Sequence, residues 1–200
     1  MRVFGIICEY NPFHRGHKWQ IDELRRLAGE EECAVVCAMS GDFVQRGDFT
    51  IERAHARAEA AVRGGADLVL ELPLPWAISS AEGFARGGVS ILAATGVVDT
   101  LAFGSECGNI DTLSRIAEIF YTEPEPYVES LRCNLKKGMS FPIARTWALL
   151  QYAPSLSDDM DVLSSPNNIL GIEYLKALMS RNSKISPFTT TTVSYTHLRA

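Results

Sequence analysis

The sequence is short of positive charge and of long apolar runs. Its 19 Lys and Arg residues against 24 Asp and Glu give a net charge of −5 at pH 7. The chain therefore has no overall positive field to attract nucleic acid. This does not exclude a local basic patch. No segment reaches the roughly 20 apolar residues of a membrane helix, and the apolar start "MRVFGIICEY" is too short for a signal-peptide core. We expect a soluble, cytoplasmic protein.

Cysteine and histidine are also scarce. The five cysteines are an odd number scattered along the chain, which argues against a disulfide scaffold. Of the four histidines, His55 and His197 lack ligand-like spacing to the pair His14 and His17. A zinc site is therefore not expected, and no metal ligands are assigned.

The sequence does contain an alternation of strand and helix patterns. Apolar runs typical of buried strands occur at 2–10, 33–40, 66–73 and 99–105, with helical patterns between them at 16–29, 51–65 and 80–95. This order predicts right-handed βαβ units, that is, an α/β fold with a Rossmann-like parallel sheet and helices on both faces. From residue 109 onward helical patterns dominate, so we expect a mostly helical extension packed on or beside the sheet.

The stretch "EYNPFHRGH", residues 9–17, follows the first predicted strand and opens the first predicted helix. Ligands of open parallel sheets bind at the carboxyl ends of the strands, where a helix N-terminus offers N–H groups and a positive dipole end to phosphate. Asn11 and Pro12 are suited to ending the strand and fixing the turn. Gly16 leaves space for a ligand near the helix start. The stretch therefore predicts a phosphate site.

His14 and His17 are the candidate catalytic residues of this site. Their ring N–H groups would donate hydrogen bonds to phosphate oxygens, and a nearby phosphate would favour the protonated rings. Such donors stabilise the charge that builds on an α-phosphate during substitution. The same spacing also fits two surface histidines or half of a metal site.

Five sequence blocks carry a family resemblance. "NPFHRGH" resembles the His-x-Gly-His signature of the nucleotidyltransferase superfamily. Together, "EYNPFHRGH", "MSGDFVQRGD", "ADLVLELPLPWAISSAEGFARGGVSIL", "LAFGSECG" and "SPNNILGIEYLKAL" resemble the bacterial tRNA(Met) cytidine acetate ligase family from about Met1 to Phe188. The resemblance implies an ATP-dependent ligase. Such an enzyme activates acetate as acetyl-adenylate, releases pyrophosphate with Mg²⁺, and acetylates N4 of the wobble cytidine in elongator tRNA(Met).

The resemblance also implies site residues. It places ATP along the first turn and adds two contacts further along the chain; the implied nucleotide-binding residues are Ile7, Cys8, Glu9, Tyr10, Asn11, Pro12, Phe13, His14, Arg15, Gly16, His17, Lys18, Trp19, Gln20, Gly104 and Asn167. Three of these also fit other roles: a turn glycine for Gly104, a helix N-cap for Asn167, and a phosphate-pairing or solvent-facing helix residue for Lys18.

Two further groups of polar residues each fit two different roles. Asp42, Gln45 and Arg46 either hold substrate or metal-bound pyrophosphate, or form a solvated loop with an internal Asp–Arg pair. The second group lies in a stretch without acidic residues, near Trp147 and Tyr152, and consists of Arg132, Lys136, Lys137 and Arg145. It fits either a basic strip that contacts tRNA or the basic exposed face of a helical hairpin.

The chain also departs from the family it resembles. Family members are roughly twice as long, with a C-terminal region that contributes to tRNA recognition, and Thr192 stands where a nucleotide-contacting Arg is expected. We predict an ATP-binding core at 1–108, a helical extension completing that domain at 109–188, and a non-native tail at 189–200. Two other functions stay open. One is an adenylyl- or cytidylyltransferase acting on a small phosphorylated acceptor, and the other is a non-catalytic nucleotide- or RNA-binding remnant.

Overall fold

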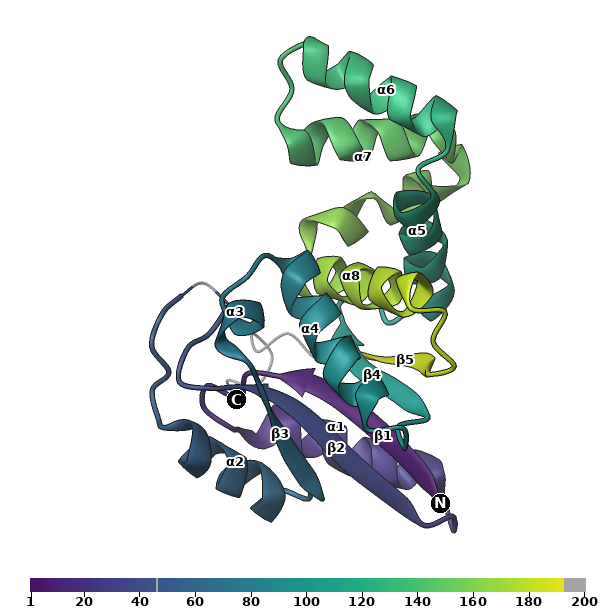
Figure 1. The fold of residues 1–200 in the computed structure, drawn as a ribbon. Helices are drawn as coiled ribbons and strands as arrows, with labels where there is room; N and C mark the ends of the chain where they lie inside the picture. The colour runs from purple at the N-terminus through teal and green to yellow at the C-terminus, as the bar shows by residue number, and fades with distance from the viewer. Residues whose placement is uncertain (46, 193–200) are drawn as a thin grey trace, which may run out of the picture.

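A five-stranded, fully parallel sheet forms the centre of the molecule (Figure 1). The computed structural model describes residues 1–45 and 47–192, without the side chains of 157–161. The strands run in the order β3-β2-β1-β4-β5. Their bounds are Arg2–Cys8 for β1, Cys33–Ser40 for β2, Leu68–Leu72 for β3, Thr100–Ser105 for β4 and Ser186–Thr191 for β5.

Helices cover both faces of the sheet because alternate side chains of each strand point to opposite faces. In β1, Val3 and Ile7 join one apolar core with residues of α4 (Ala81–Ala94), α5 (Ile110–Thr122) and α8 (Pro166–Ser180). Phe4 and Ile6 join a second core on the other face, with residues of α1 (Arg15–Ala28) and α2 (Ala54–Arg63). The predicted Rossmann-like fold with helices on both faces is confirmed.

The strand order reverses between β1 and β4. The chain builds β1, β2 and β3 in one direction across the sheet, and β4 and β5 then lie on the other side of β1. Such a reversal leaves a crevice at the carboxyl ends of the two central strands, where ligands of open α/β sheets bind. The predicted phosphate turn follows β1 directly and therefore lies at this crevice.

The helical patterns after residue 109 correspond to real helices. Asn109 caps α5, its side-chain oxygen accepting from the N–H groups of Asp111 and Thr112 at 3.1 Å each. Beyond α5, helices α6 (Glu125–Lys136) and α7 (Phe141–Tyr152) form a hairpin that stands away from the sheet (Figure 1). A 3-10 segment, η1 (Pro154–Ser164), then leads to α8.

Three elements were not predicted: the short helix α3 (Leu74–Ala77), the 3-10 segment η1 and strand β5. The strand pairs with β4 from Thr100↔Ser186 to Ser105↔Thr191, so it crosses the boundary that we predicted at 188. Residues 189–191 therefore belong to the sheet, because β-branched threonines pair well on a strand that is already present. Residues 193–200 of the predicted tail lie outside the described residues.

The structure contains neither a membrane-spanning helix nor a disulfide among the described residues. Within the described residues, none of the helices has the length and apolar character needed to cross a membrane. The five cysteines, Cys8, Cys33, Cys37, Cys107 and Cys133, are free thiols.

Candidate nucleotide-binding site

His14 and His17 cap the N-terminus of α1. His14 Nδ1 accepts a hydrogen bond from Gly16 N–H at 3.1 Å, and His17 Nδ1 accepts from His14 N–H at 3.3 Å. This is a reciprocal capping box, built from two imidazoles in place of the more common Ser or Thr with Glu or Gln. Both rings therefore have a defined position at the start of the helix.

These hydrogen bonds also fix the protonation of the two rings. A nitrogen that accepts carries no proton, so the neutral form of each ring has its proton on Nε2. Burial and the neighbouring His14 lower the pKa of His17 to about 4. Burial also lowers the pKa of His14. Without a ligand, both rings are therefore neutral Nε2–H donors near pH 7. The protonation that we expect beside a bound phosphate stays a prediction.

Aromatic side chains pack against one another in the turn between β1 and α1. Tyr10 is buried, adopts a left-handed backbone conformation with φ of 46°, and hydrogen bonds through its hydroxyl with Cys37 Sγ at 3.6 Å. Its ring centroid lies 5.0 Å from that of Phe13 and 4.7 Å from that of His17. A bulky residue rarely adopts positive φ, and these contacts hold Tyr10 in that conformation and position His17.

Arg57, which no sequence pattern singles out, joins the carboxyl ends of β1 and β2. The side chain is fully buried. Its Nη groups donate to the carbonyl oxygens of Glu9, Ser40 and Gly41, and its Nε donates to Glu52 O at 3.1 Å. Burial lowers the pKa of this guanidinium. The sequence offers one sign of this role: Arg57 lies on the face of α2 that packs toward the sheet, together with Ala61.

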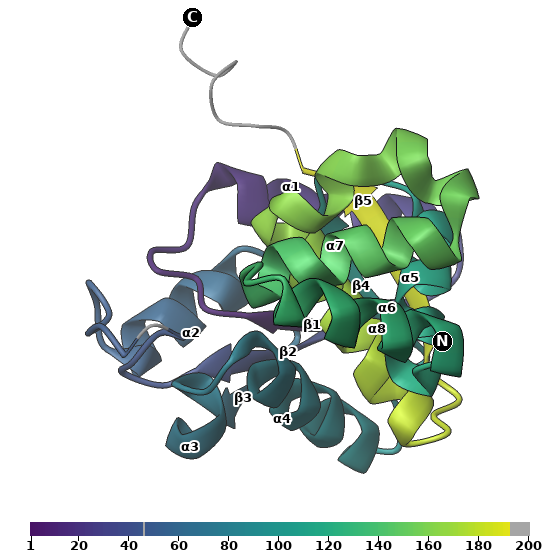
Figure 2. The ribbon, with the colours of Figure 1, turned by 90° about the horizontal axis from the view of Figure 1, so that it is seen from above.

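The loop between β2 and α2 lies beside the first turn (Figure 2). Gln45 N–H donates to Glu9 Oε1 at 2.6 Å, and Ile51 N–H donates to Asn11 Oδ1 at 2.7 Å. Asp42 accepts from Ala54 N–H at 2.8 Å. The turn and the loop thus form one hydrogen-bonded unit. Arg46, the third polar residue singled out in this loop, lies outside the described residues.

On the other side of the strand-order reversal, β4 leads to Glu106, which contacts the start of α8. Glu106 accepts hydrogen bonds from the backbone N–H groups of Asn167 and Asn168 at 3.2 and 2.9 Å, and from Asn167 Nδ2 at 3.0 Å. The N-cap position of α8 belongs to Ser165, so the N-cap role considered for Asn167 is wrong: its amide instead hydrogen bonds with Glu106. Its nucleotide contact stays a prediction.

Gly104 lies in β4 beside the last described residue. A Cβ at Gly104 would lie 2.5 Å from Thr192 Cγ2, and Thr192 N–H donates to Ser105 O at 2.8 Å. Gly104 is therefore a strand glycine closely covered by position 192, and not a turn glycine. The position where the family pattern expects an Arg lies at the same edge of the sheet as the predicted nucleotide site.

The remaining predicted residues of the first block divide between β1, the turn and α1. Ile7 and Cys8 contribute their side chains to the two cores. Only their backbone, at the carboxyl end of β1, is left to contact a nucleotide. Lys18 forms an exposed ion pair with Asp22 at 2.8 Å, the arrangement of a solvent-facing helix residue. Trp19 is 46% exposed. Asn11, Pro12 and Phe13 lie in the turn, and Arg15, Gly16 and Gln20 lie in α1.

The predicted basic strip lies on the α6–α7 hairpin. Arg132, Lys136 and Lys137 are exposed and form no ion pair with any described residue. Arg145 differs, because its guanidinium lies over the rings of Phe120 and Phe141, 4.8 and 5.8 Å from their centroids. Three of the four residues therefore present their charge to solvent, and Arg145 stacks on aromatic rings.

The fold and the capped histidine turn define a class of protein. The chain belongs to the HIGH nucleotidyl transferase family, whose model matches residues 1–198. It is similar to curated proteins named tRNA(Met) cytidine acetate ligase. That of Acetivibrio thermocellus is 49% identical over 94% of this chain and 45% of the relative, and that of Halothermothrix orenii is 46% identical over 94% and 46%.

A solved structure resembles the whole described fold. The crystal structure of Thermotoga maritima TmcAL bound with alpha-thio ATP superposes with a TM-score of 0.91 at 41% identity. The match covers 98% of this chain and 47% of that one. This chain therefore spans about half the length of the curated relatives it matches.

Proposed function

We propose that this chain is the nucleotide-binding part of an ATP-dependent acetate ligase that acts on tRNA. The substrates are ATP, acetate and the wobble cytidine of elongator tRNA(Met). The observation that carries the proposal is the pair of Nε2–H donors held by His14 and His17 at the N-terminus of α1. The acetate and the cytidine come from the relatives, which are named tRNA(Met) cytidine acetate ligase.

In the first step, a carboxylate oxygen of acetate attacks the α-phosphorus of ATP. The bond from this phosphorus to the bridging oxygen of pyrophosphate breaks, and pyrophosphate leaves. His14 and His17 donate hydrogen bonds to the α-phosphate oxygens and transfer no proton, so they act by stabilising charge. The peptide N–H groups at the start of α1 add to this stabilisation.

In the second step, the N4 amine of cytidine attacks the acetyl carbon. The bond between this carbon and the phosphate oxygen breaks, AMP leaves, and the amine loses one proton. The crevice has to hold the mixed anhydride away from water until the amine arrives.

Mg²⁺ enters this scheme as part of the ATP substrate. Within the described ranges, no group of three or more His, Cys, Asp and Glu side chains is placed to hold a metal ion. Phosphate oxygens and water are therefore the main ligands that we expect for Mg²⁺, in keeping with its common coordination in nucleotide sites.

For the tRNA, we propose a contact with the exposed strip of Arg132, Lys136 and Lys137, with Arg145 adding its charge beside them. The exposed rings of Trp147 and Tyr152, 50% and 40% exposed, lie on the neighbouring helix and suit stacking on loop bases. Reversing Lys136 and Lys137 to Glu should weaken tRNA binding and spare ATP binding. Unchanged tRNA affinity would contradict this contact.

An exchange assay tests the proposed function. The chain is incubated with ATP, labelled pyrophosphate and acetate, and label entering ATP is measured. Acetate-dependent exchange supports the acetate ligase. Exchange that requires a phosphorylated acceptor instead supports another nucleotidyltransferase, and ATP binding without exchange supports a non-catalytic remnant.

A further inference from the structure

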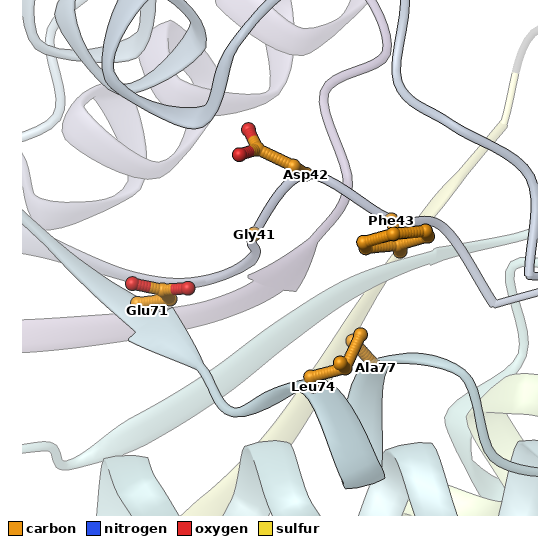
Figure 3. Close-up of a pocket in the computed structure, with 6 residues that line it drawn as sticks. All are labelled: Gly41, Asp42, Phe43, Glu71, Leu74 and Ala77. Atoms are coloured by element: carbon orange, nitrogen blue, oxygen red, sulfur yellow. The ribbon is translucent and has the colours of Figure 1, made fainter.

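A small cavity opens at the carboxyl ends of β2 and β3, beside the phosphate turn (Figure 3). Its volume is about 170 Å³, and its lining residues are Gly41, Asp42, Phe43, Glu71, Leu74 and Ala77. The cavity is smaller than the pockets of whole drug-sized ligands and matches a single planar ring.

Two walls of the cavity are apolar. Phe43 lies on one side, and Leu74 and Ala77 of α3 lie on the other (Figure 3). The Phe43 ring packs against the ring of Phe49, with ring centroids 4.9 Å apart. Apolar surfaces that face each other across such a gap suit the two faces of a nucleobase, which binds proteins largely by stacking.

The carboxylate of Glu71 supplies the polar group. No hydrogen bond or ion pair joins it to another residue within 1–45 and 47–192. It lies against the backbone of Gly41, where an added Cβ would be only 2.6 Å from Glu71 Oε1. Asp42 differs, since its carboxylate is bonded to Ala54 N–H and points away from Leu74 and Ala77 in Figure 3.

The cavity adjoins the proposed reaction centre. One guanidinium, that of Arg57, donates both to Gly41 O in the cavity lining and to Glu9 O at the start of the phosphate turn. The two carbonyls therefore lie within the span of a single planar group. A ring in the cavity would be a neighbour of a nucleotide bound at the His14–His17 turn.

We propose that this cavity receives the aminopyrimidine base of the acceptor, with Glu71 accepting a hydrogen bond from its exocyclic amine. The proposal rests on the proposed function, which makes cytidine the acceptor. An ionised carboxylate only accepts hydrogen bonds, so it pairs with the N4–H of cytosine and repels the O4 acceptor of uracil. Glu71 is thereby a specificity-determining residue that selects cytidine over uridine.

The test compares cytidine and uridine, two neutral nucleosides, as ligands of the 200-residue chain. A non-hydrolysable ATP analogue is kept saturating to fill the nucleotide site, and binding is followed through backbone amide chemical shifts. Cytidine is expected to shift the amides of Gly41, Phe43 and Ala77, with a Kd about fivefold or more below that of uridine. Equal Kd values, or shifts confined to other residues, would overturn the proposal.

Variants separate the carboxylate from its surroundings. In Glu71→Gln the amide accepts from cytosine or donates to uracil, so the preference should fall to about one. Asp48→Asn removes an exposed carboxylate of the loop between β2 and α2 that does not line the cavity, and it should leave the preference unchanged. A preference retained in Glu71→Gln would overturn the role of Glu71, and the amide spectrum shows directly that each variant is folded.

The exchange assay on the same samples keeps the two proposals distinct. A cytidine preference without acetate-dependent exchange would support the base cavity and contradict the proposed acetate activation. Exchange without a cytidine preference would support acetate activation and overturn the base cavity.

Discussion

The imidazole ring of His14 lies over that of His17, with ring centroids 3.6 Å apart and planes inclined by 21°. Each ring accepts a backbone hydrogen bond through Nδ1. The helix cap and the proposed phosphate donors are therefore opposite edges of the same two rings. Local stability and chemistry are linked at this turn, and both can be measured.

Replacing His17 separates these two contributions. In His17→Ala, acetate-dependent exchange should fall about 100-fold or more, the usual effect of losing a donor that stabilises transition-state charge. The free energy of unfolding should fall by only about 1 kcal/mol, the effect of one lost helix-capping bond. Exchange rates and urea midpoints of the purified variant give both values. Arg26→Ala, in the last turn of the same helix, removes an exposed ion pair with Glu23 and should keep its exchange rate within about threefold. A near-normal rate in His17→Ala would contradict the phosphate role.

The stability of the chain should fall as the pH falls from 6.5 to 4. Burial holds the pKa of His17 at about 4 in the folded chain, against an ordinary value of 6.5. Between these values the unfolded chain binds a proton that the folded chain does not, so acid favours unfolding, and the full contribution is present above pH 6.5. His14, whose pKa is also lowered, acts in the same direction.

Urea midpoints at pH 7 and pH 4.5 measure this dependence. The decrease between the two pH values should be larger in the wild type than in His17→Ala, because the variant lacks the group that titrates. Equal decreases would show that His17 does not carry the effect.

Arg57 should be among the most costly residues to replace. In Arg57→Met, the buried carbonyls of Glu9, Ser40 and Gly41 lose their shared donor. A loss of about 3 kcal/mol or more in the free energy of unfolding is expected. Arg63→Met, in the same helix, removes an exposed ion pair with Glu59 and should cost less than about 1 kcal/mol. Urea unfolding of the two variants provides the comparison, and similar midpoints would contradict the role of Arg57 as a clamp.

Restoring the arginine of the family pattern should strengthen ATP binding. Thr192 covers Gly104 at the edge of the crevice, so Thr192→Arg places a guanidinium within reach of a nucleotide bound there. The Kd for ATP, measured by calorimetry, should fall several-fold, and the gain should diminish at high salt. Ser186→Arg, at the opposite end of β5, adds the same charge far from the site and serves as the control. An equal gain in both variants would indicate a general charge effect.

Much of the fold follows from local sequence patterns. The apolar runs of β1 to β4 and the helical periodicity of α1, α2 and α4 depend on neighbouring residues, and the structure has these elements where they were predicted. Helices α5 to α8 lie in the region after residue 109 that was predicted to be mostly helical. Strand β5 was missed because "SPFTTT" has no apolar alternation. Its conformation is decided by pairing with β4, a partner more than 80 positions away in the chain.

The candidate site divides in the same way. The sequence by itself determined the His-x-Gly-His turn, its place after the first strand and its family, because these depend on residues that are close together in the chain. Only the tertiary structure decided which imidazole nitrogens keep their protons, that Arg57 clamps Glu9 to Gly41, and that Glu106 holds Asn167. Arg57 is 48 positions from Glu9, and Glu106 is 61 from Asn167. Buried polar groups need partners, and in this protein the fold supplies those partners from distant parts of the chain.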